Sequence, residues 1–232
     1  EEYKEEFVVE ELFILIDRFG YIKTVDMQTY NRCSEDTLNE YNTIIKTLNT
    51  DKLCMFTTEG NLHQIKVLDM PTGKIKDKGV PIDTISDIGK EEPILITTFD
   101  EIKDKKLLFI TDLGYTKIID GKEFESIRRN INSTKLSDGD KVKMVTPIDY
   151  TISHITVVSE DNYLLKFERS EVPEQKRVAV GVITLKLKDN DRIKSVYLTQ
   201  TDEKLKIKAN KKNIDLNEVK VLRRNHKGIK IE

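Results

Sequence analysis

The chain has 232 residues, 38% hydrophobic and 34% charged, a composition that excludes a disordered protein and suffices for one large domain or two smaller ones. No apolar run approaches the roughly 18 residues that a membrane-spanning helix needs, and no signal peptide is recognised at the start. The net charge of −2 argues only mildly against nucleic-acid binding, because recognition depends on where the charged residues lie.

The two ends of the chain carry opposite charge. Residues 1–12 contain six Glu and a single Lys, and we expect so acidic a stretch to be a solvated linker, although it could also mask a basic surface of the same molecule. Residues 202–232 carry ten Lys or Arg against five acidic residues, the clearest local excess of positive charge.

From residue 13 onward the sequence repeats an apolar run, a polar turn and a second apolar run. Four copies begin at Phe13, Leu53, Leu107 and Ile155, with Gly20, Gly60, Gly114 and Asn162 in their turns, and a fifth, weaker copy begins at Val196. Each copy predicts a hairpin, in which glycine or asparagine supplies the positive φ of the turn. Turns 40 to 54 residues apart in a strand-rich chain favour a propeller-like array of blades.

The segments between the hairpins share a basic loop that ends on glycine and a β-branched residue. The three such pairs are Gly79-Val80, Gly181-Val182 and Gly228-Ile229. Each pair predicts a further strand that completes a blade or joins it to the next one. No segment keeps a helical period, and the nearest approach, residues 34–50, predicts a short helical turn at most.

Side chains that commonly carry catalysis or bind metals show no useful spacing. Cys33 and Cys54 lack a CxxC pattern and are expected to be free thiols, and the three histidines are isolated. Paired acids such as Glu91-Glu92 have no metal-ligand spacing, and no P-loop occurs. Tyr21, Tyr115 and Tyr163 each follow the residue at the turn, so packing at a repeat position explains them. We predict no catalytic residue and no metal site.

Two hairpins carry a family pattern most clearly: "TTEGNLHQIK" from Thr57 and "TDLGYTK" from Thr111. The chain has no Trp, hence no WD repeat, and no Gly-Gly pair, hence no kelch repeat. The hairpins and basic loops instead resemble the C-terminal domain of the A subunit of bacterial type IIA topoisomerases, gyrase and topoisomerase IV. The resemblance covers residues 13–232 and implies an all-β fold, a β-pinwheel of about five four-stranded blades that exchange strands with their neighbours. It also implies that residues 1–12 are a linker from an upstream catalytic domain, to which the family's nucleophilic tyrosine belongs.

The resemblance implies that the rim of the pinwheel binds duplex DNA without sequence specificity and bends it. Lysines that recur at one blade position suit this task, because phosphates need only point charges at intervals. The predicted DNA contacts are the hairpin residues Lys23, Lys66, Lys117 and Lys166, the loop residues Lys74, Lys76, Lys78, Arg128, Arg129, Lys176 and Arg177, and the C-terminal residues Arg223, Arg224 and Lys227. For any one hairpin lysine, the alternative is a solvated strand face that deters edge pairing.

One departure bears on the choice between the two enzymes. Gyrase has a basic, glycine-rich box of seven residues after the first hairpin, which the family needs for chiral wrapping. The segment after Tyr30 reads "NRCSEDTLNEY", in which Arg32 is the only base beside three acids. This absence, and about five repeats instead of six, favour the topoisomerase IV version, which serves decatenation and relaxation, over a weakly wrapping gyrase domain.

The resemblance also sets the expected partners. Double-stranded DNA is the partner of this domain, and the full-length A subunit is implied to homodimerise and to pair with an ATPase B subunit, in the cytoplasm at the nucleoid. No cofactor is expected in this domain, since ATP and Mg²⁺ are implied only for the full enzyme. The alternative from another class is a protein-interaction propeller, which would keep the repeats without needing the lysine track and suits the net charge of −2 slightly better.

Overall fold

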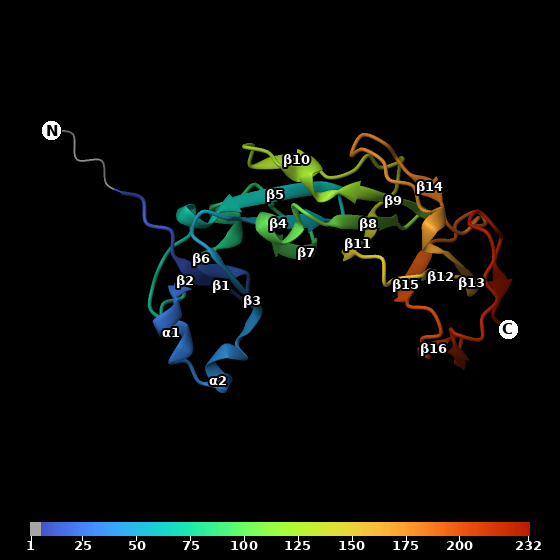
Figure 1. The fold of residues 1–232 in the computed structure, drawn as a ribbon, viewed down its shortest axis with the longest axis horizontal. Coiled ribbons are helices and arrows are strands. Elements are labelled where there is room, and N and C mark those ends of the chain that lie inside the picture. The colour runs from blue at the N-terminus through green and yellow to red at the C-terminus, as the bar shows by residue number, and fades with distance from the viewer. Residues whose placement is uncertain (1–5) are drawn as a thin grey trace.

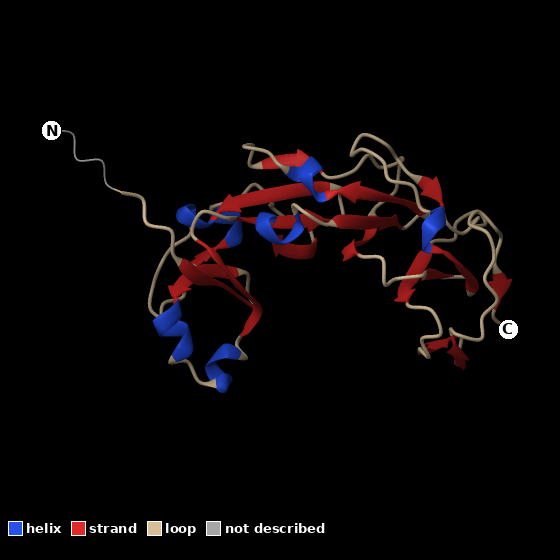
Figure 2. Ribbon diagram, in the orientation of Figure 1, coloured by secondary structure: helices blue, strands red, loops and turns tan. Residues whose placement is uncertain are grey.

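The computed structural model describes residues 6–232, and nearly all of its regular structure is short antiparallel strands (Figure 2). The strands are β1 (Glu11–Asp17), β2 (Tyr21–Asp26), β3 (Tyr41–Leu48), β4 (Lys52–Thr57), β5 (Asn61–Lys66), β6 (Val80–Pro81), β7 (Pro93–Thr98), β8 (Lys106–Thr111), β9 (Tyr115–Asp120), β10 (Asn130–Asn132), β11 (Val142–Ile148), β12 (His154–Ser159), β13 (Tyr163–Glu168), β14 (Val182–Ile183), β15 (Ile193–Thr199), β16 (Lys206–Ala209), β17 (Lys212–Asp215) and β18 (Ile229–Lys230). The helices are α1 (Met27–Asn31), α2 (Glu35–Leu38) and α3 (Phe99–Ile102), with single 3-10 turns η1 (Val67–Asp69), η2 (Ile82–Thr84), η3 (Gly121–Phe124) and η4 (Arg169–Glu171).

Four sheets follow one plan, and we call them blades 1 to 4. Their strand orders are β3-β1-β2-β6, β7-β4-β5-β10, β11-β8-β9-β14 and β15-β12-β13-β18. The two middle strands of each blade are a hairpin, and the last strand comes from beyond the next hairpin in the chain. Neighbouring blades therefore exchange strands, which confirms the β-pinwheel.

The blades stand side by side along an open arc, with blade 1 at one end (Figure 1). The exchanged strands β6, β10, β14 and β18 lie on the convex edge of this arc, and β3, β7, β11 and β15 lie on its concave edge. Every basic loop that leads into an exchanged strand is therefore on the convex side.

The expectation of five four-stranded blades holds for four of them. Within residues 6–232 the fifth sheet, blade 5, contains only β16 and β17. The prediction that a fifth hairpin begins at Val196 is wrong. That residue lies in β15, a flanking strand of blade 4. The real turn uses Asn210 and Lys211, at φ of 46° and 63°, so no glycine marks it, although Asn210 lies 48 residues after Asn162, within the earlier range of spacings.

The first blade begins earlier than expected. Strand β1 starts at Glu11, inside the segment 1–12 that was predicted as linker, and residues 1–5 of that segment lie outside the described residues. Asn49 binds the backbone just before this start, because its amide donates to the carbonyl oxygen of Val8 and its side-chain oxygen accepts from the backbone amide of Glu10. The segment from Ser34 contains α2 and then β3, so its helical part is one turn, as predicted.

The hydrophobic core lies between the blades. One cluster joins Ile14 and Ile22 of blade 1 to Met55 of blade 2, and a second joins Phe56 of blade 2 to Phe109 of blade 3. Further clusters join blades 3 and 4 and blades 4 and 5. A hairpin strand is thus buried on both faces, which is why it appears in the sequence as a continuous apolar run and not as an alternating pattern.

The predicted turns have the expected backbone. Gly20, Gly60, Gly114 and Asn162 all have positive φ, of 80°, 74°, 87° and 64°. Both cysteines are free thiols, as expected, and burial raises the pKa of Cys54 to about 12. Among residues 6–232 there is no helix of the length and apolar character that a membrane crossing requires.

Candidate nucleic-acid interface

The convex edge carries a row of basic loops, one in front of each exchanged strand. Loop 71–79 leads into β6, loop 125–129 into β10, loop 172–181 into β14 and loop 221–228 into β18. The predicted contacts that are exposed on these loops are Lys74, Lys76, Lys78, Arg128, Arg129, Lys176, Arg223 and Lys227. Because the loops recur blade by blade, their charges form a periodic positive edge along the arc.

Several of these charges already have acidic neighbours. The ammonium of Lys176 donates to Glu123, whose hydrogen bond and charge raise the pKa of Lys176. The guanidinium of Arg129 lies 3.8 Å from the carboxylate of Asp87. Both pairs are at the surface, so each contributes little to the stability of the fold, and a phosphate can replace the acidic partner.

The hairpin lysines behave differently from the prediction. Lys66 is exposed, but Lys23, Lys117 and Lys166 are 2%, 1% and 5% exposed. The ammoniums of Lys23 and Lys117 each donate to three backbone carbonyl oxygens, and that of Lys166 donates to the carbonyl oxygen of Leu216 at 2.7 Å. These three are therefore neither phosphate contacts nor solvated strand residues. Their strands are covered on both faces, so a side chain that would point outward in an open sheet is enclosed.

Two predicted contacts, Arg177 and Arg224, are half-buried and join neighbouring blades. The guanidinium of Arg177 donates to the carbonyl oxygen of Asn132, at the end of β10. The guanidinium of Arg224 donates to the carbonyl oxygen of Ile183, at the end of β14, and to that of Glu171. Each arginine thus binds the exchanged strand of the preceding blade, which limits its reach toward a ligand.

The sequence analysis missed four exposed lysines on the same edge, Lys135, Lys186, Lys188 and Lys230. The ammoniums of Lys188 and Lys230 lie 4.7 and 4.8 Å from the ring centre of Tyr163, beside a hollow of about 290 Å³. The sequence "TLKLKD" from Thr184 indicates two of these exposed lysines, because Lys186 and Lys188 alternate with leucines. The contact of these two ammoniums with the ring supports the packing role that was predicted for Tyr163.

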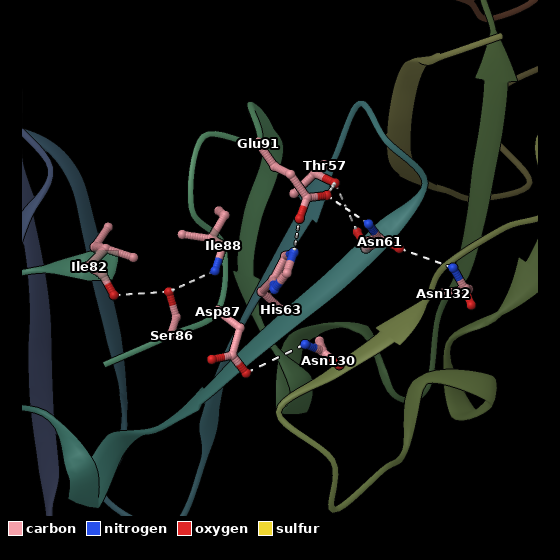
Figure 3. Close-up of polar contacts among 10 residues, drawn as sticks. All are labelled: Thr57, Asn61, His63, Ile82, Ser86, Asp87, Ile88, Glu91, Asn130 and Asn132. Atoms are coloured by element: carbon pink, nitrogen blue, oxygen red, sulfur yellow. Dashed lines mark hydrogen bonds and ion pairs between the residues drawn. The ribbon is translucent and has the colours of Figure 1, made fainter. Parts of the chain in front are cut away.

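A hollow of about 1030 Å³ lies between the loops of blades 2 and 3. Its bases are Arg128, Lys135 and Arg177, and its acids are Glu59, Asp87 and Glu91. Figure 3 shows the acidic part, where the carboxylate of Glu91 accepts hydrogen bonds from Thr57 at 2.9 Å and Asn61 at 2.7 Å and lies 2.6 Å from the ring nitrogen of His63. Burial raises the pKa of Glu91, but the hydrogen bonds from Asn61, Thr57 and His63 outweigh it and hold the pKa below its ordinary value.

The fold and the row of loops define a class, the β-pinwheel with a basic convex edge. Residues 105–148 and 153–200, which are the repeats of blades 3 and 4, match the family described as DNA gyrase C-terminal domain, beta-propeller. In sequence and in fold the chain is similar to the C-terminal domains of the A subunits of topoisomerase IV and gyrase.

Relatives of both kinds match equally well in sequence. The chain is 29% identical over 202 residues to the A subunit of DNA topoisomerase 4 from Streptococcus pyogenes and 29% identical over 196 residues to the A subunit of DNA gyrase from Helicobacter pylori. These matches cover 81% and 79% of the chain, and the chain spans about a quarter of either relative, 24%. In structure, it matches the crystal structure of the C-terminal domain of DNA topoisomerase IV with a TM-score of 0.82 and 26% identity, over 97% of this chain and 73% of that one.

Proposed function

We propose that residues 13–232 bind duplex DNA without sequence specificity along the convex edge and bend it around the arc. The observation that carries the proposal is the row of four basic loops on one edge. Phosphates need positive charge at intervals and no base readout, and a bend is repaid by each further loop that reaches the backbone.

The net charge of −2 is compatible with this function because charge is unevenly placed. Acidic residues occupy the segment after Tyr30 and the first residues of the chain, whereas the loops and the C-terminal segment are basic. Association with DNA responds to the local field of the loops, not to the total.

We infer further that this is the domain of a topoisomerase IV A subunit, which positions DNA for decatenation and relaxation by catalytic domains elsewhere in the enzyme. Two observations support topoisomerase IV. The segment after the first hairpin folds into α2 with Glu35 and Asp36 in its first turn, in place of a basic box. The TM-score to a gyrase A C-terminal domain is 0.58, against 0.82 for topoisomerase IV.

Under this proposal the whole protein would homodimerise, pair with an ATPase B subunit that uses ATP and Mg²⁺, and work at the nucleoid in the cytoplasm. Residues 1–10 would be the linker to its catalytic domain, since β1 begins at Glu11.

The test is binding to duplexes of ~30 and ~150 bp across a salt series. Affinity should rise with duplex length and fall steeply with salt, with a slope of about −0.9 for each phosphate neutralised. Reversing Arg128, Arg129 and Lys176 to Glu should weaken binding to both duplexes and lower the salt slope by about 1 for each lost contact.

The matched control reverses exposed lysines of the concave edge, Lys46 on β3 and Lys194 on β15. It should leave affinity and slope unchanged. Equal losses in both variants would place the DNA elsewhere, and no binding of either duplex at low salt would refute the DNA role.

A protein-interaction surface is the second candidate, and one observation favours it. Ile127 is 100% exposed and Val178 is 79% exposed, at the tips of the two central loops. If the loop reversals leave DNA binding intact, these tips are the first residues to test for a protein partner.

A further inference from the structure

Two buried lysines bind the inside of the basic loops. Lys23 of β2 and Lys117 of β9 are each the third residue of the second hairpin strand, in blades 1 and 3. The ammonium of Lys23 lies 3.3, 2.6 and 2.5 Å from the carbonyl oxygens of Lys74, Ile75 and Asp77.

The ammonium of Lys117 makes the same contacts in blade 3. It lies 3.1 and 3.2 Å from the carbonyl oxygens of Lys176 and Arg177, and it donates to that of Ala179 as well. The two sets of acceptors occupy the same three positions before the loop glycines, Gly79 and Gly181. The arrangement is therefore a repeated feature of the fold and not a single chance contact.

The hydrogen-bonding capacity of the lysine ammonium explains why three carbonyl oxygens surround it. An ammonium has three donors and no acceptor, so three converging carbonyl oxygens satisfy it completely. A buried ammonium without such partners would be strongly unfavourable. Conversely, the oxygens of Asp77 and Ala179 have no other hydrogen-bond donor among the described residues, so an apolar side chain in place of the lysine would leave them unpaired.

These contacts fix the direction of the loop peptides. With their carbonyl oxygens turned inward to the ammonium, the loops keep Lys74 and Lys76 of blade 1, and Lys176 of blade 3, exposed on the convex edge. The loop also lies very close to the strand, since a Cβ on Gly181 would come within 2.7 Å of the carbonyl oxygen of Thr116.

The lysine and the loop belong to different repeats. Lys23 is in the hairpin of blade 1, but loop 71–79 follows the hairpin of blade 2 and then returns as β6 to pair with β2. Lys117 and loop 172–181 stand in the same relation, through β14 and β9. Each ammonium therefore holds the chain at the point where one blade receives a strand from the next.

We propose that Lys23 and Lys117 are positioning residues for DNA binding: each holds the basic loop of the following repeat in the shape that presents its exposed lysines, and so secures the strand exchange between neighbouring blades. The DNA part rests on the proposed function. The loop-holding part does not.

The test compares Lys117→Met with Lys66→Met, which removes one exposed hairpin lysine and hence the same charge. In Lys117→Met, amides that tie the loop to β9, such as that of Gln175, should exchange hydrogen at least tenfold faster, while the loop of blade 2 is unchanged. Affinity for the ~150 bp duplex should fall about tenfold, against about twofold in Lys66→Met.

A spectroscopic signature separates this role from simple packing. In ¹H–¹⁵N spectra of the lysine side chains, the ammonium protons of Lys23 and Lys117 should exchange slowly with water, and those of Lys66 rapidly. Lys117→Gln should recover part of the loop protection, because an amide already does this in blade 2, where Gln64 donates to the carbonyl oxygen of Arg128 at 2.8 Å. The glutamine variant also serves if the methionine variant does not fold.

The outcomes distinguish the two proposals. Faster loop exchange in a domain that binds no DNA would support loop holding and refute the DNA role. Normal DNA binding with unchanged loop exchange in Lys117→Met and Lys117→Gln would overturn the positioning role and leave the DNA role standing.

Discussion

Blades 1 and 3 differ from blades 2 and 4 at one position of the repeat, the third residue of the second hairpin strand. Lys23 and Lys117 occupy it in blades 1 and 3, His63 in blade 2 and Leu165 in blade 4, and each lies opposite the middle of the first hairpin strand. All four side chains are buried. Their partners are loop carbonyls in blades 1 and 3, the carboxylate of Glu91 in blade 2 and an apolar cluster in blade 4.

The loop of blade 2 still receives a side-chain donor, whereas the loop of blade 4 supplies one. Gln64, one position further along β5, donates to the loop of blade 2. In blade 4 the loop's own Arg224 donates to the carbonyl oxygens of Glu171 and Ile183. Side-chain hydrogen bonds to backbone carbonyls thus fasten the loop in every blade, but in blade 4 the loop provides the donor and not the acceptors.

The largest expected effect comes from moving the lysine of blades 1 and 3 into blade 4. Leu165→Lys should lower the free energy of unfolding by about 3–5 kcal/mol, because Leu165 is fully buried in an apolar cluster. Urea denaturation measures the loss. Leu165→Met is the control and should cost less than about 1.5 kcal/mol. Near-native stability of Leu165→Lys would mean that blade 4 can also hold an ammonium.

The close approach of loop and strand in blade 1 predicts a smaller effect. Gly79 has φ of 79°, and a Cβ there would lie 2.3 Å from the carbonyl oxygen of Ile22. Gly139, in a loop with φ of 72°, has no atom within 4 Å of a built Cβ, so Gly139→Ala measures the backbone cost alone. Gly79→Ala should destabilise by about 2 kcal/mol more than Gly139→Ala. Equal unfolding midpoints would show that the loop of blade 1 can move away without cost.

The ammonium of blade 3 predicts a pH effect of known sign. Burial, and next the charge of Arg177, lower the pKa of Lys117 to about 8, from an ordinary value of 10.5. The native state thus binds this proton less tightly than the unfolded chain, so the contribution of Lys117 to the free energy of unfolding rises with pH from about 8 up to 10.5. Between pH values of about 7.5 and 9 the rise is on the order of 1 kcal/mol.

Urea unfolding of the wild type and of Lys117→Met over this range checks the rise, because only the wild type should show it. Parallel pH profiles of the two proteins would contradict the prediction.

The carboxylate of blade 2 predicts an effect of the same sign, at acidic pH, and a smaller one. Because the pKa of Glu91 lies below its ordinary value of 4.5, its contribution is present above pH 4.5 and is lost as the pH falls through the lowered pKa. Glu91→Gln should remove about 0.5–1 kcal/mol at about pH 6 and less at a pH below the lowered pKa of Glu91. Glu92→Gln, at the exposed neighbour, is the control and should be neutral at both.

The hairpins were predictable because a strand buried on both faces is apolar over most of its length and its turn must adopt positive φ. The exchanged strands β6, β14 and β18 were marked by their glycines, since a loop that lies against a strand backbone has no room for a side chain, whereas β10, which follows Arg129, was not marked. The fifth hairpin was missed because its turn uses Asn210 and Lys211, and because the flanking strand β15 resembles a hairpin strand.

Local sequence is sufficient to establish the repeat, the turns of the first four hairpins and the placement of basic residues in loops, because these depend on backbone geometry and on the apolar character of each strand. The exchange of strands between blades was implied by the family resemblance and is decided by the tertiary structure. Local sequence is not sufficient to establish which basic residues face solvent, and that follows from the packing of one blade against the next. Lys23, Lys117 and Lys166 have the same local sequence character as Lys66. They are buried because a neighbouring repeat, 50 or more residues further along the chain, places carbonyl oxygens over them.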